Sequence, residues 1–112
     1  MTKVTFSLQG DRILSVDILD HAGFAEEGKD IACAAISSAA MLTTVLLDDI
    51  QGIPVVTEEN EPETRIRIEL PAEYVERGQE GMLALRHYFK VLEKEYFPDF
   101  INVMEVHTDA ED

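Results

Sequence analysis

The sequence predicts an α+β fold in the order β-β-α-β-β-α-β, with a mixed, mainly antiparallel sheet packed against two helices. Apolar residues alternate with polar ones over the first 18 residues and again over residues 64–70, whereas they recur at helical spacing beyond residue 81. Short connections between the extended runs favour hairpins, and hence antiparallel pairing. A chain of 112 residues is expected to form a single domain, residues 1–112.

The N-terminal segment predicts a β-hairpin. Apolar and polar residues alternate over residues 4–9 and again over residues 14–18, and Gly10-Asp11 lies between the two runs. A glycine at the first turn position is what a type II′ turn requires. We therefore expect two antiparallel strands joined by a tight turn.

A long helix is predicted after an irregular connection. Residues 20–29 follow neither period, and Gly23 and Gly28 predict a flexible loop that can open and close over a ligand. Asp30 is expected to act as the N-cap of the helix, and Gly52 lies just beyond its end. The helix carries few polar residues, so we expect the sheet and something else to cover it.

The second half of the chain predicts three further elements after one more extended run. That run leads into residues 58–63, which are read as an acidic, solvated turn. Residues 64–70 form the most regular alternating strand in the sequence, and an amphipathic helix over residues 82–97 follows. Residues 100–106 are read as the last strand.

Charge and composition disfavour several classes of function. With 23 acidic and 9 basic residues the net charge is −14, which argues against nucleic acid and anionic membranes and suits a basic protein tail. We see no apolar run near the roughly 20 residues of a membrane span and no secretory signal, so a soluble protein is expected. One cysteine excludes multi-cysteine metal sites and fits a reducing compartment, so we expect a cytoplasmic protein.

Cys33 is the most interesting reactive side chain. It is the only thiol, and it lies about three residues after the expected N-cap, where free amide groups and the helix dipole stabilise an anion. His21 lies where the second predicted strand gives way to the loop that leads back to Cys33. The two residues can therefore form a pair in which the imidazole takes the thiol proton.

Each candidate residue also has a simpler interpretation. Cys33 can be a small core residue and His21 a surface or turn residue. For Asp30 we prefer the N-cap to a third catalytic member, and Ser37, one turn beyond Cys33, either touches the site or only packs.

No metal site or cofactor is expected. His87 lies among helix residues and His107 near the C-terminal tail, and the sequence places no partner ligands beside them. The glutamates at residues 58–63 match no calcium-loop spacing, and no glycine-rich phosphate loop is present.

The loop and helix start resemble a known family. The stretch His21-Ala-Gly-Phe-Ala-Glu-Glu-Gly-Lys-Asp-Ile-Ala-Cys-Ala-Ala-Ile-Ser37 is similar to the signature of the ribosomal-processing cysteine protease family, Prp, which reads H-A-G-x-A-x-x-G-x-D-I-x-C-A-A-x-S. Length and element order resemble the family over essentially the whole chain, including the run at residues 96–101. One departure is Asp20, where many members carry glycine.

The resemblance implies an activity and a partner. Cys33 would be the nucleophile and His21 its partner, with Asp30 and Ser37 in supporting positions. The implied substrate is large-subunit ribosomal protein twenty-seven, whose N-terminal extension is removed after an apolar, aromatic-containing segment to expose a basic tail. The family forms homodimers, so a homodimer is expected.

Our leading hypothesis is therefore a site-specific cysteine endopeptidase that matures a ribosomal protein. The alternative is a non-catalytic, acidic, dimeric protein that binds a basic ribosomal-protein tail and merely buries its thiol. A redox-sensing thiol is a third, weaker hypothesis.

Overall fold

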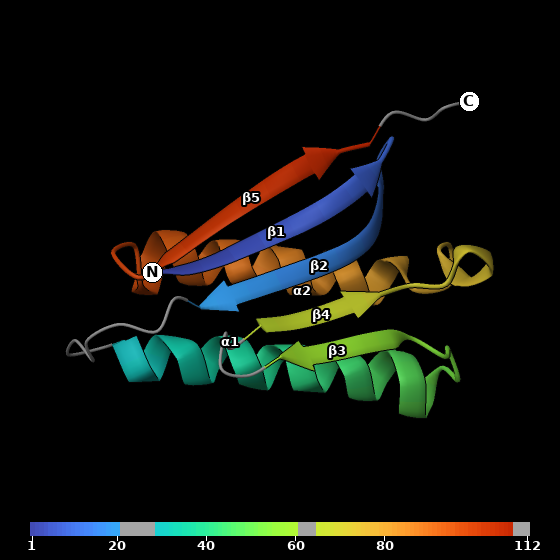
Figure 1. Cartoon of the computed structure of the whole chain (residues 1–112), viewed down its shortest axis with the longest axis horizontal. Helices are drawn as coiled ribbons and strands as arrows, with labels where there is room; N and C mark the ends of the chain where they lie inside the picture. Colours follow the sequence, from blue (N-terminus) through green and yellow to red (C-terminus); the bar gives the residue numbers. More distant parts are fainter. Residues whose placement is uncertain (21–28, 61–64, 109–112) are drawn as a thin grey trace.

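The computed structural model describes residues 1–20, 29–60 and 65–108 (Figure 1). The predicted order of strands and helices is confirmed, with short helical turns added. The elements are β1 (Thr2–Gln9), β2 (Arg12–Asp20), α1 (Lys29–Thr44), the π-helical η1 (Val45–Ile50), β3 (Val56–Asn60), β4 (Arg65–Glu69), the 3-10 turn η2 (Ala72–Tyr74), α2 (Gln79–Val91), the π-helical η3 (Leu92–Tyr96) and β5 (Ile101–His107).

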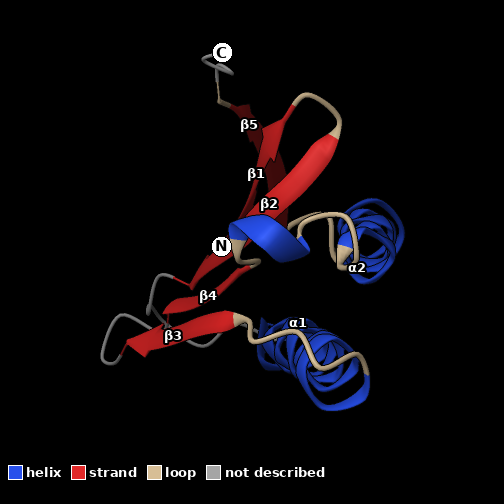
Figure 2. Ribbon diagram, turned by 90° about the vertical axis from the view of Figure 1, so that its right-hand side faces the viewer, coloured by secondary structure: helices blue, strands red, loops and turns tan. Residues whose placement is uncertain are grey.

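The strands form one mixed sheet with the spatial order β3-β4-β2-β1-β5. Strands β1 and β5 are parallel, and the other three neighbouring pairs are antiparallel. Both long helices lie on the same side of this sheet, as the edge-on view in Figure 2 shows. The α+β class with a mainly antiparallel sheet is thus confirmed.

The N-terminal hairpin is present and carries one irregularity. Gly10 has φ +62°, the sign that a primed turn needs at its first central position. The pairing register shifts between Ser7 and Leu8, as at a β-bulge. Nearby, the Ile13 amide donates to Gln79 Oε1 at 2.9 Å, and Gln79 Nε2 donates to the Ile13 carbonyl at 2.8 Å. The side chain of Gln79 therefore ties the hairpin to the start of α2.

The core lies between the sheet and the two helices. Phe6 and Phe89 are both fully buried, and their ring centroids are 6.2 Å apart. Around them the alternating strand residues supply one wall and the helices the other. The other buried apolar residues of the strands and of α1 include Val4, Leu8, Ile13, Val16, Ile18, Ile68, Ala32, Ile36 and Ala40.

The start of α1 differs from the prediction. The helix begins at Lys29, so Asp30 is a helical residue of the first turn and the N-cap assignment is wrong. A carboxylate in the first helical turn is favoured by the same free amides and dipole as one at the cap, so the sequence signal is the same for both positions. The C-terminal end of the long helix agrees with the prediction. Gly52 has φ +71°, and its amide donates to the Asp48 carbonyl at 3.1 Å.

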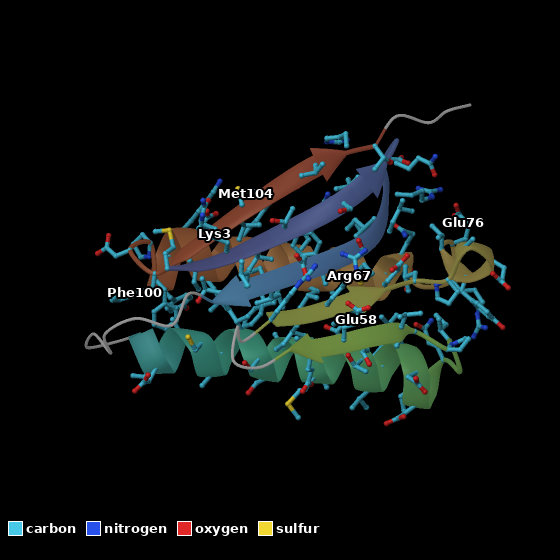
Figure 3. All side chains as sticks on the ribbon, in the orientation of Figure 1. Lys3, Glu58, Arg67, Glu76, Phe100 and Met104 are labelled. Atoms are coloured by element: carbon cyan, nitrogen blue, oxygen red, sulfur yellow. The ribbon has the colours of Figure 1, made fainter. Side chains whose placement is uncertain are left out.

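The acidic turn predicted at residues 58–63 is also wrong in its first part. Glu58 and Glu59 belong to strand β3, where Glu58 lies opposite Arg67 of β4 (Figure 3). Strand β3 is at the edge of the sheet, where charged side chains are tolerated and hinder pairing with other chains. Residues 61–64 lie outside the described part of the chain.

One helical segment changes the expectation about membranes. Residues 30–50 form a helix of 21 residues with a hydropathy of 1.8, long and apolar enough by length and composition to cross a membrane. The sequence prediction of no such segment is therefore wrong. The core helix of a protein passes the same test; here Ala32, Ile36 and Leu47 are buried in the core, and 22% of the apolar window is buried.

Candidate active site around Cys33

Cys33 is the fifth residue of α1 and is partly buried. Asp30 precedes it by three residues and Ser37 follows it by four, so the helical repeat places all three on one face of α1. Asp30 is exposed and Ser37 is partly buried. Ser37 thus lies on the face of Cys33 as the sequence predicted, whereas the supporting roles of Asp30 and Ser37 stay predictions.

The sulfur of Cys33 lies against the sheet. Cys33 Sγ is 3.8 Å from Thr2 Oγ1, a hydrogen-bond contact in which either group can donate. Thr2 is only 2% exposed, and its amide donates to the Phe100 carbonyl at 2.8 Å. Phe100 is labelled in Figure 3 at the end of the sheet where β1 begins, and the first turn of α1 lies at the same end in Figure 1. The thiol is thus held between a helix start and a strand start.

The same contact brings the end of β2 close to the thiol. Strand β1 lies between β2 and β5, and Thr2 is paired with Asp20 on one side and Ile101 on the other. Asp20 directly precedes His21 in the sequence. His21 and the glycines at 23 and 28 lie outside the described residues, so the Cys33–His21 pair and the flexible loop stay predictions.

The electrostatic environment of Cys33 differs from the sequence expectation. In a helix that begins at Lys29, the amide of Cys33 is already paired with a carbonyl one turn back. The first residues of α1 precede the thiol by about one turn. Because the dipole effect falls off within the first turn, the helix end stabilises an anion at Cys33 less than a position nearer the cap would.

Thr2 is the residue of this site that the sequence reasoning missed. The alternation along the first strand could have identified it. Thr2 lies on the same side of the strand as Val4, Phe6 and Leu8, which face the core. A hydroxyl on that face has to be buried, and a buried hydroxyl needs a hydrogen-bond partner. The identity of the partner, Cys33, depends on how α1 packs and was not visible in the sequence.

The remaining titratable candidates lie away from Cys33. His87 is exposed on α2, and His107 Nε2 lies 4.0 Å from Glu105 Oε1 on β5. Hydrogen bonding from Lys90, together with the charges of Lys90 and Arg86, lowers the pKa of Glu105. In the part of the chain that the structure describes, no three His, Cys, Asp or Glu side chains are grouped as metal ligands.

Comparison with protein families gives one match over most of the chain. The model of a family described as "Cysteine protease Prp" matches residues 1–102. No curated protein matches the chain.

Solved structures share this fold. SMU.848 from Streptococcus mutans is 26% identical, with a TM-score of 0.84 and 96% of each chain covered. Two structures described as an essential ribosomal processing protease Prp from S. aureus are also similar. The complex with a substrate peptide is 15% identical with a TM-score of 0.85, and 95% of this chain and 100% of that chain are covered. The complex with a covalently linked product peptide is 17% identical with a TM-score of 0.81 and the same coverage.

Proposed function

Because the chain belongs to the cysteine protease Prp family and is a cysteine protease, we propose that it is a site-specific endopeptidase that processes a ribosomal protein. Cys33 is the nucleophile, and His21 is the general base and acid. The observation that carries this proposal is the contact between Cys33 and Thr2, because Thr2 is paired with the residue before His21. The end of β2 and the start of α1, between which His21 lies in the sequence, are therefore close to each other.

The reaction needs only these two side chains and backbone amides. His21 takes the proton from Cys33 Sγ, and the sulfur anion attacks the carbonyl carbon of the scissile peptide bond. Backbone amides near Cys33, at the start of α1, stabilise the negative charge that develops on the carbonyl oxygen. His21 then gives its proton to the leaving amine, and a water molecule hydrolyses the thioester that remains on Cys33.

The substrate we propose is large-subunit ribosomal protein twenty-seven, cut at the junction of its N-terminal extension. The S. aureus neighbour is described as a ribosomal processing protease in complex with a substrate peptide, and the signature at residues 21–37 resembles that family. A net charge of −14 suits a substrate with a basic tail, since opposite charges raise the rate of encounter.

Mass spectrometry of a peptide that spans this junction tests the proposal. We expect the wild type to cut the peptide once, after the apolar segment, and Cys33→Ala to leave it intact. His21→Ala should lower kcat/KM by roughly 10²- to 10⁴-fold because general acid–base catalysis is lost. His87→Ala, a change of an exposed histidine on α2, is the matched control and should act as the wild type does.

Two results would contradict the proposal. If the wild type binds the peptide tightly and leaves it intact, the chain acts as a binding protein for that tail. If His21→Ala cuts as fast as His87→Ala, the cysteine works without the histidine partner.

We also propose a homodimer in the cytoplasm. The side chains of Ile31 and Ile50, near the two ends of the helix formed by α1 and η1, are 65% and 72% exposed, and large exposed apolar side chains of this kind are buried in an assembly. A single cysteine fits the reducing cytoplasm. Light scattering at micromolar concentration should give twice the monomer mass, and a monomer at all concentrations would refute the dimer.

A further inference from the structure

A groove runs between the first helix and the edge of the sheet, and we call it the strand-side groove. Its volume is about 250 Å³, and Figure 1 shows β3 and β4 alongside α1. The wall is mostly apolar, with one carboxylate at Glu59. The residues that the argument uses are Ala40, Met41, Thr44, Thr57, Glu59 and Ile66.

Of the residues that line the strand-side groove, Ala40 and Thr44 lie on the face of α1 that carries Cys33, and Met41 lies about 80° from it around the helix axis. Each helical residue turns the direction by about 100°, so Ala40 and Thr44 point within about 20° of Cys33 around the axis. Ser37 lies between them and the thiol on the same face. Ala40 is only 2% exposed, so a chain that continues from Cys33 along this side of the helix reaches the groove past the partly buried Ser37 and Thr44.

The distance between the two features fixes which part of a bound peptide would reach the groove. From Cys33 to Ala40 and Thr44 the helix rises about 10 to 16 Å, at 1.5 Å per residue. An extended peptide covers this distance in about three to five residues. The groove is thus within reach of a side chain roughly three or four residues from the scissile bond.

A second cavity lies between α1 and α2, and we call it the helix-side groove. It is larger, at about 380 Å³, and is lined by residues such as Ala39, Leu42, Leu85 and Tyr88. Leu42 points about 180° away from Cys33 around the axis of α1. A peptide held at the thiol would have to pass around the helix to fill this cavity, so it serves as a comparison.

We propose that the strand-side groove binds an apolar side chain of the substrate, three or four residues from the bond that Cys33 cuts, and so sets part of the cleavage specificity. This inference rests on the protease function proposed above. An apolar side chain that binds against Met41 and Ile66 removes apolar surface from water, which makes binding more favourable. Glu59 is exposed at the groove and favours a basic residue next to that side chain.

Neighbouring residues on α1 give a matched pair of variants. Met41 is 67% exposed and lines the strand-side groove, whereas Leu42 is 69% exposed and lines the helix-side groove. Met41→Gln and Leu42→Gln therefore make similar changes in exposed apolar surface on two different sides of the same helix. Each variant is assayed with the junction peptide and with versions in which apolar residues three or four places from the scissile bond, on either side, are changed to alanine.

The readout is the ratio of kcat/KM between the parent peptide and its alanine versions. For the wild type and Leu42→Gln, one alanine version should be cut about fivefold more slowly than the parent, the effect expected for partial burial of one apolar side chain. For Met41→Gln this ratio should fall toward one. A change in folding or assembly alters both peptides alike and leaves the ratio unchanged.

Equal ratios in Met41→Gln and the wild type would overturn the groove proposal while leaving the protease function in place. If the wild type cuts no peptide, the protease function fails separately. The groove is then tested with fluorescently labelled parent peptide and Cys33→Ala protein, where added Met41→Gln should weaken binding and added Leu42→Gln should not. Equal affinity in that case also overturns the groove proposal.

Discussion

Replacing Thr2 by valine tests whether its hydroxyl supports the reactive sulfur. Valine has nearly the same shape as threonine and is equally suited to a strand. Strand β1 should therefore persist, together with the hydrogen bond from the backbone amide of residue 2 to the Phe100 carbonyl. The change removes the oxygen that lies 3.8 Å from Cys33 Sγ. A hydroxyl that donates to the sulfur stabilises the anion more than the neutral thiol, and its loss should therefore make the anion harder to form.

The size of the effect follows from the contact. A hydrogen bond to a charged group contributes about 1.5–3 kcal/mol, and sulfur at 3.8 Å is a long contact, so we take the lower end. About 1.4 kcal/mol corresponds to a tenfold change in the equilibrium between anion and thiol. The pH at which alkylation of Cys33 reaches half its maximal rate should thus rise by about one unit in Thr2→Val.

The assay is the rate of iodoacetamide alkylation of the only cysteine, followed by mass spectrometry from pH 5 to pH 10. Thr2→Ser keeps a hydroxyl and is the control that should retain the wild-type midpoint. Thermal unfolding of all three proteins shows whether the strand itself has changed. A midpoint in Thr2→Val that equals the wild-type value, with a normal unfolding curve, would refute an electrostatic role for Thr2.

Three further changes test how the fold is held. Gln79→Leu should leave the backbone amide and carbonyl of Ile13 without their hydrogen-bond partner and lower the free energy of unfolding, measured with denaturant, by about 3 kcal/mol. A decrease below about 0.5 kcal/mol would show that other groups form hydrogen bonds with them. Gly52→Ala should cost about 1 kcal/mol in the same assay, because alanine is strained at a φ of +71°. The added Cβ meets no atom within 4 Å, so no steric clash contributes, and an unchanged stability would argue against the positive φ. Pairing with Lys90 lowers the pKa of Glu105, so the stability it adds is present above the ordinary value of 4.5 and is lost as the pH falls through the lowered pKa. Lys90→Met should therefore reduce stability by up to about 1 kcal/mol at pH 7 and by progressively less as the pH falls below about 4.5, and a loss that stays the same on acidification would assign it to packing.

Local patterns in the sequence were enough to predict the element order. Alternation over residues 4–9 and 64–70 reports one buried face of a strand, and the glycine at 10 marks a tight turn, because these features depend only on neighbours in the chain. The same locality explains the errors at Asp30 and Glu58. A carboxylate suits both the cap and the first turn, and glutamates suit both a turn and an exposed edge strand.

Long-range packing decided the rest, since a local period says which face is buried and not what buries it. The sequence by itself identified Cys33 as the reactive candidate and placed it near a helix start. Only the tertiary structure, with β1 between β2 and β5, brought Thr2 against that sulfur and the end of β2 beside it. It also decided which side of α1 faces β3 and β4, because contacts between distant segments depend on how the sheet is ordered and on where each helix crosses it.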